Sequence, residues 1–256
     1  MLRKFVVFSI IKLIILLKNC DSFSFSSKVP SITRLKMKDI LYDMPVSNHG
    51  ARVRIIIAAK ELNSFIDIKK PQDIGGLKSP EYLKLNMQGK MPLYVTDKGF
   101  PIPESDTICR YVIDKYNSDP SFIPKDILLR SLSDQISRIH DIYITPIQGC
   151  LYKAPGSLFS NYGSDRRSAL NELKKQLNGI EQLLESFNEK FPKLSGNFLC
   201  GNEISLSDAT LFPTVVFCVF MFPQFFNIEV NEFLGPKLQK WFKFLSTDVS
   251  YTRLVR

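Results

Sequence analysis

The stretch from Asn86 to Tyr116 constrains the fold of this chain more than any other. Residues 93–102 predict a β-hairpin, because two short apolar runs flank Thr-Asp-Lys-Gly, which is rich in turn-forming residue types. Pro92 stands at the entrance of the first strand, where a residue without an amide hydrogen takes nothing from the sheet ladder. From Glu104 onward, apolar residues recur at helical spacing: Ile108, Tyr111, Val112 and Tyr116. The stretch therefore predicts a proline-fixed strand entrance beside the N-terminus of a helix.

Two features of this stretch indicate a site for a small peptide. If the Met91-Pro92 peptide bond is cis, the amide and carbonyl of Met91 project outward and can pair with an extended peptide. Both isomers are open at this point. At the start of the helix, unpaired amides and the positive end of the helix dipole favour a carboxylate, and Glu104 offers a partner for an ammonium group. The alternative for Glu104 and Ser105 is ordinary helix capping, but their place beside the strand entrance favours the ligand site.

The elements around this stretch give the fold class. A strand at 40–42, a helix at 51–62 and a strand at 65–68 precede it, followed by an irregular stretch through Gly75 and Gly76. Strand, helix, strand, hairpin and helix is the thioredoxin order. The sequence therefore predicts an α/β thioredoxin-like N-terminal domain at 39–118, a linker at 119–126, and an all-α helical C-terminal domain at 127–256.

In the second domain the apolar periodicity is helical. Residues 127–143 form one amphipathic run, and an apolar stripe on a second helix runs from Leu170 to Phe187. Ser205 and Asp208 have the spacing of a capping box, in which hydroxyl and carboxylate satisfy each other's backbone amides. The apolar run at 211–226 is interrupted by two prolines and falls short of a clean membrane span. It favours a buried helix followed by an aromatic-lined connection.

Charge and cysteine content exclude two classes of site. The net charge of +9 comes mostly from residues 1–38, which hold eight Lys or Arg and the single acid Asp21, so +2 remains on the rest of the chain. The folded part therefore carries no basic footprint for nucleic acid. The five cysteines show no paired or metal-like spacing, and there are only two histidines. The sequence therefore predicts no metal site and mostly buried, reduced thiols.

Residues 1–38 predict a targeting leader. Two basic residues precede an apolar run from Phe5 to Leu17, and small residues at 20–22 suit cleavage before Phe23, as in a signal peptide. The stretch behind it is rich in Ser and basic residues and lacks acids. A signal peptide followed by phenylalanine and such a stretch resembles the two-part plastid presequence of algae with secondary plastids. The alternatives are the secretory pathway and the mitochondrion.

Three motifs occur in order along the chain. They are Leu-Tyr-Asp-Met-Pro-Val-Ser-Asn-His-Gly-Ala-Arg-Val-Arg at 41–54, Gly-Lys-Met-Pro at 89–92 with Glu-Ser-Asp-Thr-Ile-Cys-Arg-Tyr-Val at 104–112, and Ile-Ser-Leu-Ser-Asp-Ala-Thr-Leu-Phe at 204–212. Together they resemble the cytosolic-type glutathione transferases over roughly residues 39–250. The first motif is nearest to the phi class of the serine-type enzymes. Met87 and Lys90 depart from the phi pattern, in which proline and glutamine are common at those positions.

The resemblance implies an enzyme that binds glutathione, ionises its thiol and directs it at a small hydrophobic electrophile, as in detoxification, and that forms a homodimer. Ser47 is the implied catalytic residue, with Tyr42 as the rival donor to the sulfur. By the same resemblance, Lys78 holds the glycine carboxylate of glutathione, Lys90, Met91 and Pro92 flank its cysteinyl part, and Glu104 and Ser105 take its γ-glutamyl end.

Other functions on the same fold stay open. The main alternative is a non-catalytic transferase-like protein that carries hydrophobic ligands or serves as an assembly domain. A further alternative is a glutathione-dependent isomerase or peroxidase. Position 47 is not a cysteine, which argues against the omega-like and dehydroascorbate-reducing branches. For the electrophile, the resemblance implies a wall of aromatic residues in the helical half: Tyr143, Tyr152, Phe159 and the region 217–226.

Overall fold

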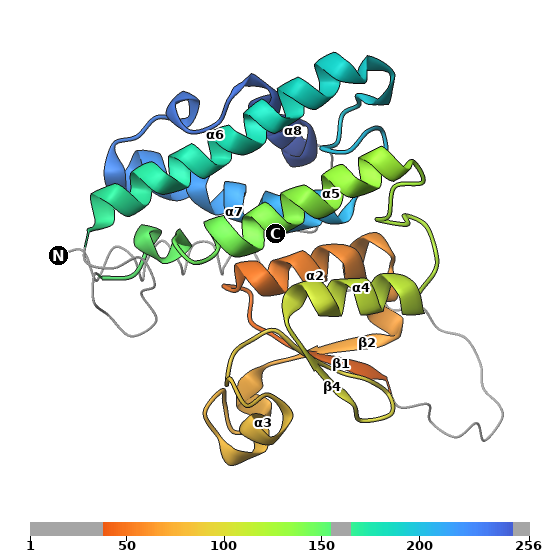
Figure 1. Ribbon diagram of the computed structural model, residues 1–256. Coiled ribbons are helices and arrows are strands. Elements are labelled where there is room, and N and C mark those ends of the chain that lie inside the picture. Colours follow the sequence, from red (N-terminus) through yellow and green to blue (C-terminus); the bar gives the residue numbers. More distant parts are fainter. Residues whose placement is uncertain (1–37, 155–164, 248–256) are drawn as a thin grey trace. The chain divides into compact units, whose positions relative to one another are not determined.

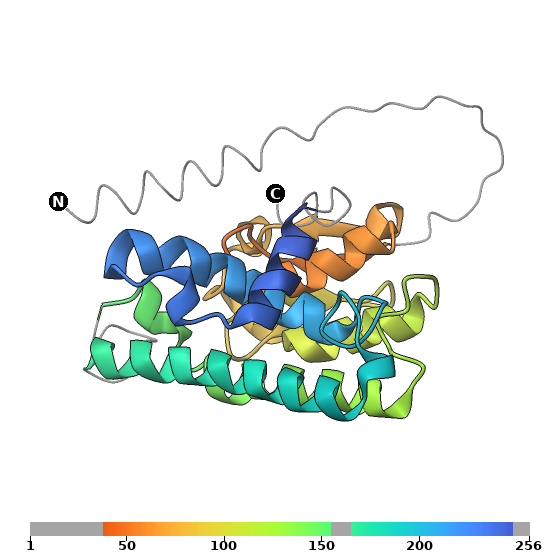
Figure 2. The same ribbon diagram turned by 90° about the horizontal axis from the view of Figure 1, so that it is seen from above.

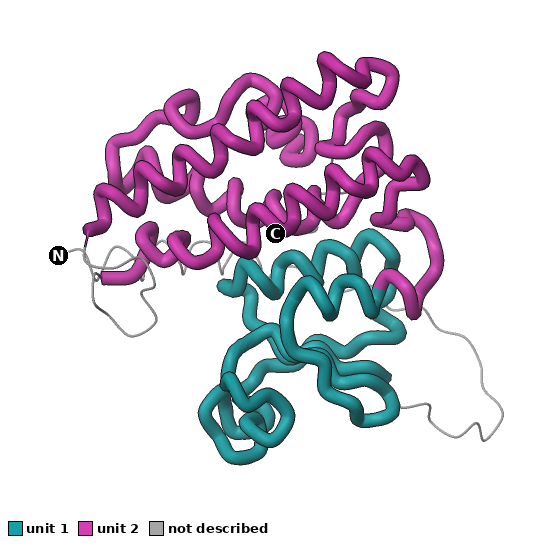
Figure 3. Tube along the Cα trace, in the orientation of Figure 1, with its two compact units in different colours: residues 1–112, 253–256 teal, residues 113–252 magenta. Residues whose placement is uncertain are grey.

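A computed structural model of the chain describes residues 38–154 and 165–247, and the chain divides into two compact units (Figures 1 and 3). Of the described residues, 38–112 belong to the first unit, and 113–154 and 165–247 belong to the second. The leader predicted for residues 1–38 lies outside the described residues except for Lys38, and Phe159 also lies outside them. The structure describes one chain, so the homodimer stays a prediction.

The first unit is built on a four-stranded mixed sheet. Its strands are β1 (Asp39–Tyr42), β2 (Ile66–Lys69), β3 (Leu93–Val95) and β4 (Pro101–Pro103), in the order β2-β1-β3-β4. β1 is parallel to β2, whereas β3 is antiparallel to both β1 and β4. Two parallel strands need a crossover connection, which α2 (Asn48–Ala59) provides. This arrangement confirms the predicted α/β thioredoxin-like fold of the first half.

Side chains alternate between the two faces of the sheet, and helices cover both faces. On one face, Tyr42 and Leu93 form a core cluster with Tyr82 of α3 (Pro80–Leu85). On the other, Tyr94 lies edge-on against Tyr111 of α4 (Ser105–Lys115), with ring centroids 5.6 Å apart. Figure 1 shows α2 and α4 on the same side of the sheet. The sheet therefore lies between α3 and the pair formed by α2 and α4.

Helix α3 lies in the stretch predicted to be irregular. A 3₁₀ turn at Pro71–Ile74 precedes it, and Ser79 caps it by accepting a hydrogen bond from the Tyr82 amide at 3.1 Å. Pro80 occupies the first helical position, where its fixed φ suits the helix and its missing amide hydrogen costs nothing. Six residues are too few to show an apolar period, so the capping residues were the only signal of this helix.

The second unit is helical. Its main helices are α5 (Ile127–Ile139), α6 (Arg166–Lys190), α7 (Leu206–Met221) and α8 (Pro236–Thr247). Helix α7 is buried along most of its length and packs on α5, while α6 packs on α8. Figure 2 shows α6 running nearly straight along one edge of the unit. The predicted all-α second half is confirmed.

Two details of the helices differ from the prediction. The run at 127–143 is an α-helix only as far as Ile139 and continues as a π-helical turn at His140–Ile144. Pro213 does not interrupt α7, which continues through it to Met221. A proline inside a helix costs about 3 kcal/mol. Burial of the residues on all sides of α7 offsets this cost, because tertiary packing supplies most of the stability of a helix in a protein.

Helix α7 and the π-helical turn at Phe222–Phe226 together form an apolar segment. By length and composition alone, Leu206–Phe226 would be able to cross a membrane, and its mean hydropathy is 1.7. In this structure 56% of that window is buried, and the core helices of other folded proteins meet the same criteria.

Glu181 of α6 caps the N-terminus of α8. Its side chain is buried, and its carboxylate accepts hydrogen bonds from the amides of Lys237 at 2.7 Å and Leu238 at 2.9 Å. We expect Glu181→Leu to lower the free energy of unfolding by about 2–3 kcal/mol, because one buried and one half-buried amide lose a charged acceptor at the positive end of a helix. Glu181→Gln keeps one acceptor oxygen and should lose less. Urea titrations compare the two variants, and equal losses would contradict the capping role.

Candidate functional site

The strand register gathers the candidate residues at one end of the sheet. Tyr42 pairs with Leu93 across the antiparallel strands, and Leu93 in turn pairs with Pro103. The segment after β1, the segment before β3 and the start of α4 therefore leave the sheet at the same end. Those segments contain Ser47, Met91, Pro92, Glu104 and Ser105.

Ser47 lies at the N-terminus of α2. Its backbone is extended, and its Oγ accepts a hydrogen bond from the Gly50 amide at 3.0 Å, which is the geometry of an N-cap. The helix therefore begins at Asn48, three residues before the predicted start. The Ser47 Oγ is the acceptor in this bond, so the hydrogen of the hydroxyl group remains available for a second hydrogen bond. Ser47 can cap the helix and still donate to another group at the positive end of the helix dipole.

A buried carboxylate lies beside Ser47. Asp43 is 2% exposed, and its Oδ2 pairs with the Arg54 guanidinium, which also donates to two carbonyl oxygens of the intervening loop at 3.1 Å. Gly50 lies so close to this carboxylate that a Cβ on it would fall 1.9 Å from Oδ1. Burial raises the pKa of Asp43 to about 6, against the lowering effects of Arg54 and Ser47. The pKa of this carboxyl therefore lies well above the usual range of an aspartate.

The loop before β3 is held by its own side chains. The carbonyl oxygen of Lys90 accepts hydrogen bonds from the Tyr82 hydroxyl and the Asn86 side-chain amide, both at 2.8 Å. The next peptide bond, Met91-Pro92, is the cis isomer. Among the residues that the structure describes, neither the amide nor the carbonyl of Met91 has a hydrogen-bond partner. The Met91 backbone is thus held in place and available to an extended peptide.

Lys78 reaches the same loop. Its Nζ donates to the carbonyl oxygen of Gln88 at 3.4 Å. Gly89 has a φ of +59°, and a Cβ there would lie 2.9 Å from the Lys78 Nζ and 2.7 Å from the Leu77 carbonyl oxygen. The loop therefore needs glycine at this position, and it brings Lys78 next to the segment that carries Lys90.

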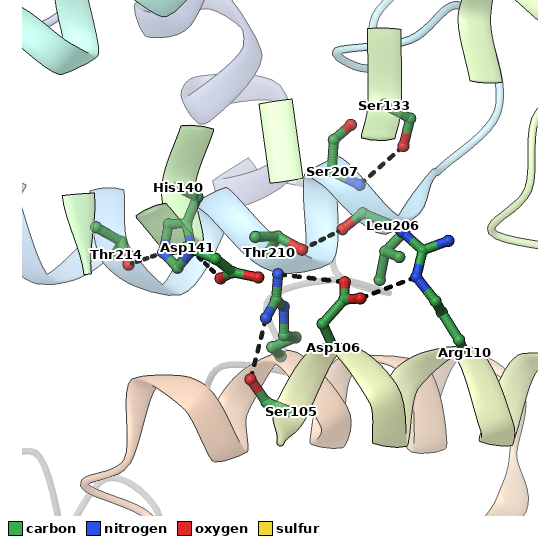
Figure 4. Close-up of polar contacts among 11 residues, drawn as sticks. Ser105, Asp106, Arg110, Ser133, His140, Asp141, Leu206, Ser207, Thr210 and Thr214 are labelled. Atoms are coloured by element: carbon green, nitrogen blue, oxygen red, sulfur yellow. Dashed lines mark hydrogen bonds and ion pairs between the residues drawn. The ribbon is translucent and has the colours of Figure 1, made fainter. Parts of the chain in front are cut away.

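The start of α4 combines an uncommon backbone conformation with a buried arginine. Glu104 has a φ of 69°, in the left-handed region that few residues other than glycine adopt. The next side chain, Ser105, is buried, and its Oγ accepts a hydrogen bond from Arg52 at 3.0 Å. Asp106 lies 3.8 Å from the Arg52 guanidinium and 2.8 Å from that of Arg110 (Figure 4). Arg52 therefore links α2 to the N-terminus of α4.

Tyr42, the rival donor, lies in the core. It is 7% exposed, and its ring lies edge-on to that of Tyr82, with centroids 6.4 Å apart. Burial raises the pKa of the Tyr42 hydroxyl, and the charge of Asp73 adds to this shift. The geometry therefore gives Tyr42 a packing role at the sheet.

The thiols are buried and the described residues hold no metal-like group. Cys109, Cys150, Cys200 and Cys218 are buried and form no disulfide within the described residues, in line with the buried, reduced thiols predicted for these four. Burial raises the pKa values of Cys150 and Cys200 to about 12, so neither is a reactive thiolate near neutrality. Within residues 38–154 and 165–247, no three His, Cys, Asp or Glu side chains are grouped as metal ligands.

Two sequence matches cover most of both units. Residues 41–120 match the family profile "Glutathione S-transferase, N-terminal domain", and residues 163–244 match "Glutathione S-transferase, C-terminal domain". The chain belongs to the glutathione S-transferase family. The resemblance inferred from the three motifs is therefore confirmed at the level of the family.

Individual relatives of this glutathione S-transferase family member are distant. It is 28% identical to Glutathione S-transferase 1 of Dianthus caryophyllus over 198 residues, which cover 75% of this chain and 81% of that protein. It is 26% identical to maleylacetoacetate isomerase of Rattus norvegicus over 181 residues, with coverages of 70% and 77%. Among solved structures, Ure2p in complex with glutathione has a TM-score of 0.67 at 16% identity, covering 88% of this chain and 95% of that chain. Glutathione transferase F2 from Populus trichocarpa has a TM-score of 0.63 at 23% identity, covering 85% and 97%. These similarities of structure establish the fold.

Sequence reasoning found the residues at the end of the sheet but missed the side chains that hold them. Asp43, Arg52 and Asn86 contact the Ser47, Ser105 and Lys90 segments, and none was predicted to do so. A signal was present for Arg52, because an arginine inside the apolar run of α2 needs a partner when the helix is buried. Asn86 gave only a turn signal, and its bond to the Lys90 carbonyl depends on the path of the loop.

In the second unit, two residues predicted for the aromatic wall are in contact. Tyr152 lies edge-on against Phe217, with ring centroids 5.7 Å apart. The same unit holds a buried histidine, His140, whose two ring nitrogens bond Asp141 and Thr214, each at 2.9 Å (Figure 4). Both nitrogens are satisfied, which explains how a histidine is accommodated there.

Proposed function

We propose that this chain is a glutathione transferase of the serine type, nearest to the phi class, that ionises the thiol of glutathione beside Ser47. The observation that carries this proposal is the register of the sheet, which brings the helix-capping Ser47, the unpaired Met91 backbone and the N-terminus of α4 to one end. An extended tripeptide that pairs with Met91 as an added strand would direct its cysteine toward Ser47 and its γ-glutamyl end toward α4.

The environment of Ser47 is strong enough to ionise a thiol. A free thiol is mostly protonated near neutrality, and the thiolate is the nucleophile. Lowering its pKa by about two units takes about 2.7 kcal/mol. A hydrogen bond to a charged group supplies about 1.5–3 kcal/mol, and the positive end of a helix adds up to about 2 kcal/mol. The Ser47 hydroxyl hydrogen and the first turn of α2 would act together on the sulfur.

The two ends of glutathione have separate partners in this proposal. The Ser105 hydroxyl and the first amides of α4 bind the γ-glutamyl carboxylate, while Glu104 pairs with the ammonium group. Arg52 fixes Ser105 from behind through its 3.0 Å hydrogen bond. Lys78 attracts the glycine carboxylate, and Lys90 flanks the cysteinyl part.

The first test is catalysis and binding with a matched pair of variants. We expect Ser105→Ala to raise the KM for glutathione about 10–100-fold and to change kcat less, because a hydrogen bond to a charged group is lost and each tenfold corresponds to about 1.4 kcal/mol. Conjugation of glutathione to a chlorinated nitrobenzene measures both constants. Thr107→Ala, at an exposed position in the same turn of α4, is the control and should match the original protein.

Failure of this proposal has a clear form. A purified protein that conjugates nothing and is not retained on immobilised glutathione would leave the non-catalytic carrier or assembly protein as the better function. If the protein is retained on immobilised glutathione but Ser105→Ala has an unchanged KM for glutathione, the γ-glutamyl end does not bind at the start of α4.

A second candidate is a glutathione-dependent isomerase. The similarity to maleylacetoacetate isomerase of Rattus norvegicus, and to a probable maleylacetoacetate isomerase of Drosophila melanogaster, favours it. The same thiolate would add to a carbon–carbon double bond, allow rotation about the resulting single bond, and leave again. An assay with maleylacetoacetate separates the two functions, since isomerisation consumes no glutathione and conjugation does.

A further inference from the structure

Asp43 is a buried carboxylate with one oxygen that lacks a donor. Its side chain has no exposed surface, and its Oδ2 pairs with Arg54. Its Oδ1 has no hydrogen-bond partner in the described part of the chain. Burying an acceptor without a donor costs stability, and most buried polar atoms in folded proteins avoid it. An unsatisfied oxygen next to a candidate active site therefore calls for an explanation in terms of what binds or reacts there.

Ser47 and Asp43 are neighbours on the same turn of α2. The Gly50 amide donates to the Ser47 Oγ at 3.0 Å, and the Cα of Gly50 lies against the Asp43 carboxylate, where a Cβ would fall 1.9 Å from Oδ1. The side chains of Ser47 and Asp43 therefore both lie next to Gly50. Ser47 is also one of the groups whose effect lowers the pKa of Asp43, against the larger raising effect of burial. The hydroxyl and the unsatisfied oxygen therefore lie against the same residue, Gly50, at the first turn of α2.

We propose that Asp43 is the proton acceptor for the glutathione thiol and acts through Ser47. The S–H bond of glutathione breaks as its proton binds the Ser47 Oγ, and the original hydroxyl proton of Ser47 passes to Oδ1 of Asp43. The sulfur keeps the electron pair of its S–H bond. The products are a thiolate, a serine that now donates to the sulfur, and a neutral Asp43. This inference rests on the proposed function, because it assigns the proton that the thiol must lose.

The charges around Asp43 suit an acceptor. Arg54 of α2 pairs with Oδ2 and so stabilises the ionised carboxyl, and the N-terminus of the same helix lies beside it. From α3, Tyr82 faces Asp43, whose negative charge contributes to raising the pKa of the Tyr82 hydroxyl. Burial is the largest effect and raises the pKa of Asp43 to about 6. Above that pH the free protein holds an ionised carboxyl, which becomes neutral when the thiolate forms, so the total charge of the buried pair does not change.

The relay predicts an unusual pH profile for kcat/KM. Between the pKa of Asp43 and that of free glutathione, the free protein has an ionised Asp43 and free glutathione has a protonated thiol. The reactive complex has a protonated Asp43 and a thiolate, so no proton is gained or lost when it forms. The value of kcat/KM should therefore be constant between the pKa of Asp43, about 6, and that of free glutathione, about 8.5. In Asp43→Asn the thiol proton must go to the solvent. In this variant log kcat/KM should rise with a slope close to one until the pH approaches the pKa of free glutathione, which is about 50-fold between pH 6.5 and 8.5 because half of the thiol is ionised at its pKa.

A second readout uses the original protein alone. Glutathione is mixed with it at pH 7 in weak buffer containing an indicator dye, and the ultraviolet absorbance of the thiolate is recorded at the same time. We expect thiolate to form without release of protons to the solvent. Asp43→Asn should release one proton for each thiolate formed. The measurement on the original protein decides the question even if Asp43→Asn fails to fold.

Asp67→Asn is the control variant, because it removes a half-exposed carboxylate from β2 of the same sheet. It should keep the flat profile of the original protein. A slope of one or a released proton in the original protein would overturn the relay while leaving the transferase function intact. So would a flat profile in Asp43→Asn, which would give Asp43 a purely structural role. Absence of glutathione binding by the original protein would instead overturn the proposed function itself.

Discussion

Asp208→Ala is expected to lower the free energy of unfolding by about 3–5 kcal/mol, the largest loss of stability from any single substitution considered for this protein. The Asp208 carboxylate is buried and accepts four hydrogen bonds. Its donors are the amides of Leu199 at 3.0 Å and Ser205 at 2.8 Å, the Ser205 hydroxyl at 2.7 Å, and the Trp241 indole at 2.8 Å. Alanine would leave the two amides and the indole buried without an acceptor, whereas the Ser205 hydroxyl keeps the Ser207 Oγ at 2.8 Å as a partner. Each unsatisfied group costs about 1–3 kcal/mol before the structure relaxes.

Urea titration measures this loss, and two variants separate its causes. Asp208→Asn keeps the side-chain volume but turns part of the acceptor into a donor that faces other donors, so most of the loss should persist. Asp126→Ala removes the cap of α5, whose carboxylate accepts from the Leu128 and Leu129 amides. It should cost about 1 kcal/mol. A loss for Asp208→Ala no larger than that for Asp126→Ala would contradict the central role of this carboxylate.

The contacts of Asp208 include one that the sequence predicts and one that it does not. Its pairing with Ser205 was predicted from their spacing, because a capping box is closed by residues three positions apart. The bond from the Trp241 indole joins residues 33 positions apart in sequence and depends on how α8 packs. Local hydrogen bonds can be read from a sequence, whereas bonds between elements need the tertiary structure.

The candidate site follows the same division. The family resemblance implied Ser47, Met91 and Glu104 as site residues, and the sequence pattern placed Ser47 before one helix and Glu104 at the start of another. Asp43 was read only as part of a motif, although it lies beside Ser47 in space. Its burial, its pairing with Arg54 and its pKa all depend on how closely α2 approaches the end of β1. Nothing in the local sequence fixes that distance.

Ser47→Ala is expected to produce the largest loss of activity, about 10–150-fold in kcat/KM at neutral pH. The physical reason is the loss of a hydrogen bond to a charged sulfur, worth about 1.5–3 kcal/mol, with each 1.36 kcal/mol equal to tenfold in rate. The pKa of bound glutathione should rise by about one to two units in the same variant. Conjugation kinetics measure the first effect, and the ultraviolet absorbance of the thiolate as a function of pH measures the second.

Two further variants assign the effect to the hydroxyl of Ser47. Alanine also removes the cap of α2, which costs about 1 kcal/mol of stability, so Ser47→Thr, which keeps both the hydroxyl and the cap, should restore most of the activity. Tyr42→Phe removes a hydroxyl from a ring packed against Tyr82 and should leave the thiolate unchanged. The opposite pattern, with activity lost in Tyr42→Phe and kept in Ser47→Ala, would transfer the donor role to Tyr42. Tyr42 lies in strand β1, whereas Ser47 lies at the N-terminus of α2. That result would therefore also mean that the sulfur of glutathione binds away from the positive end of the helix dipole.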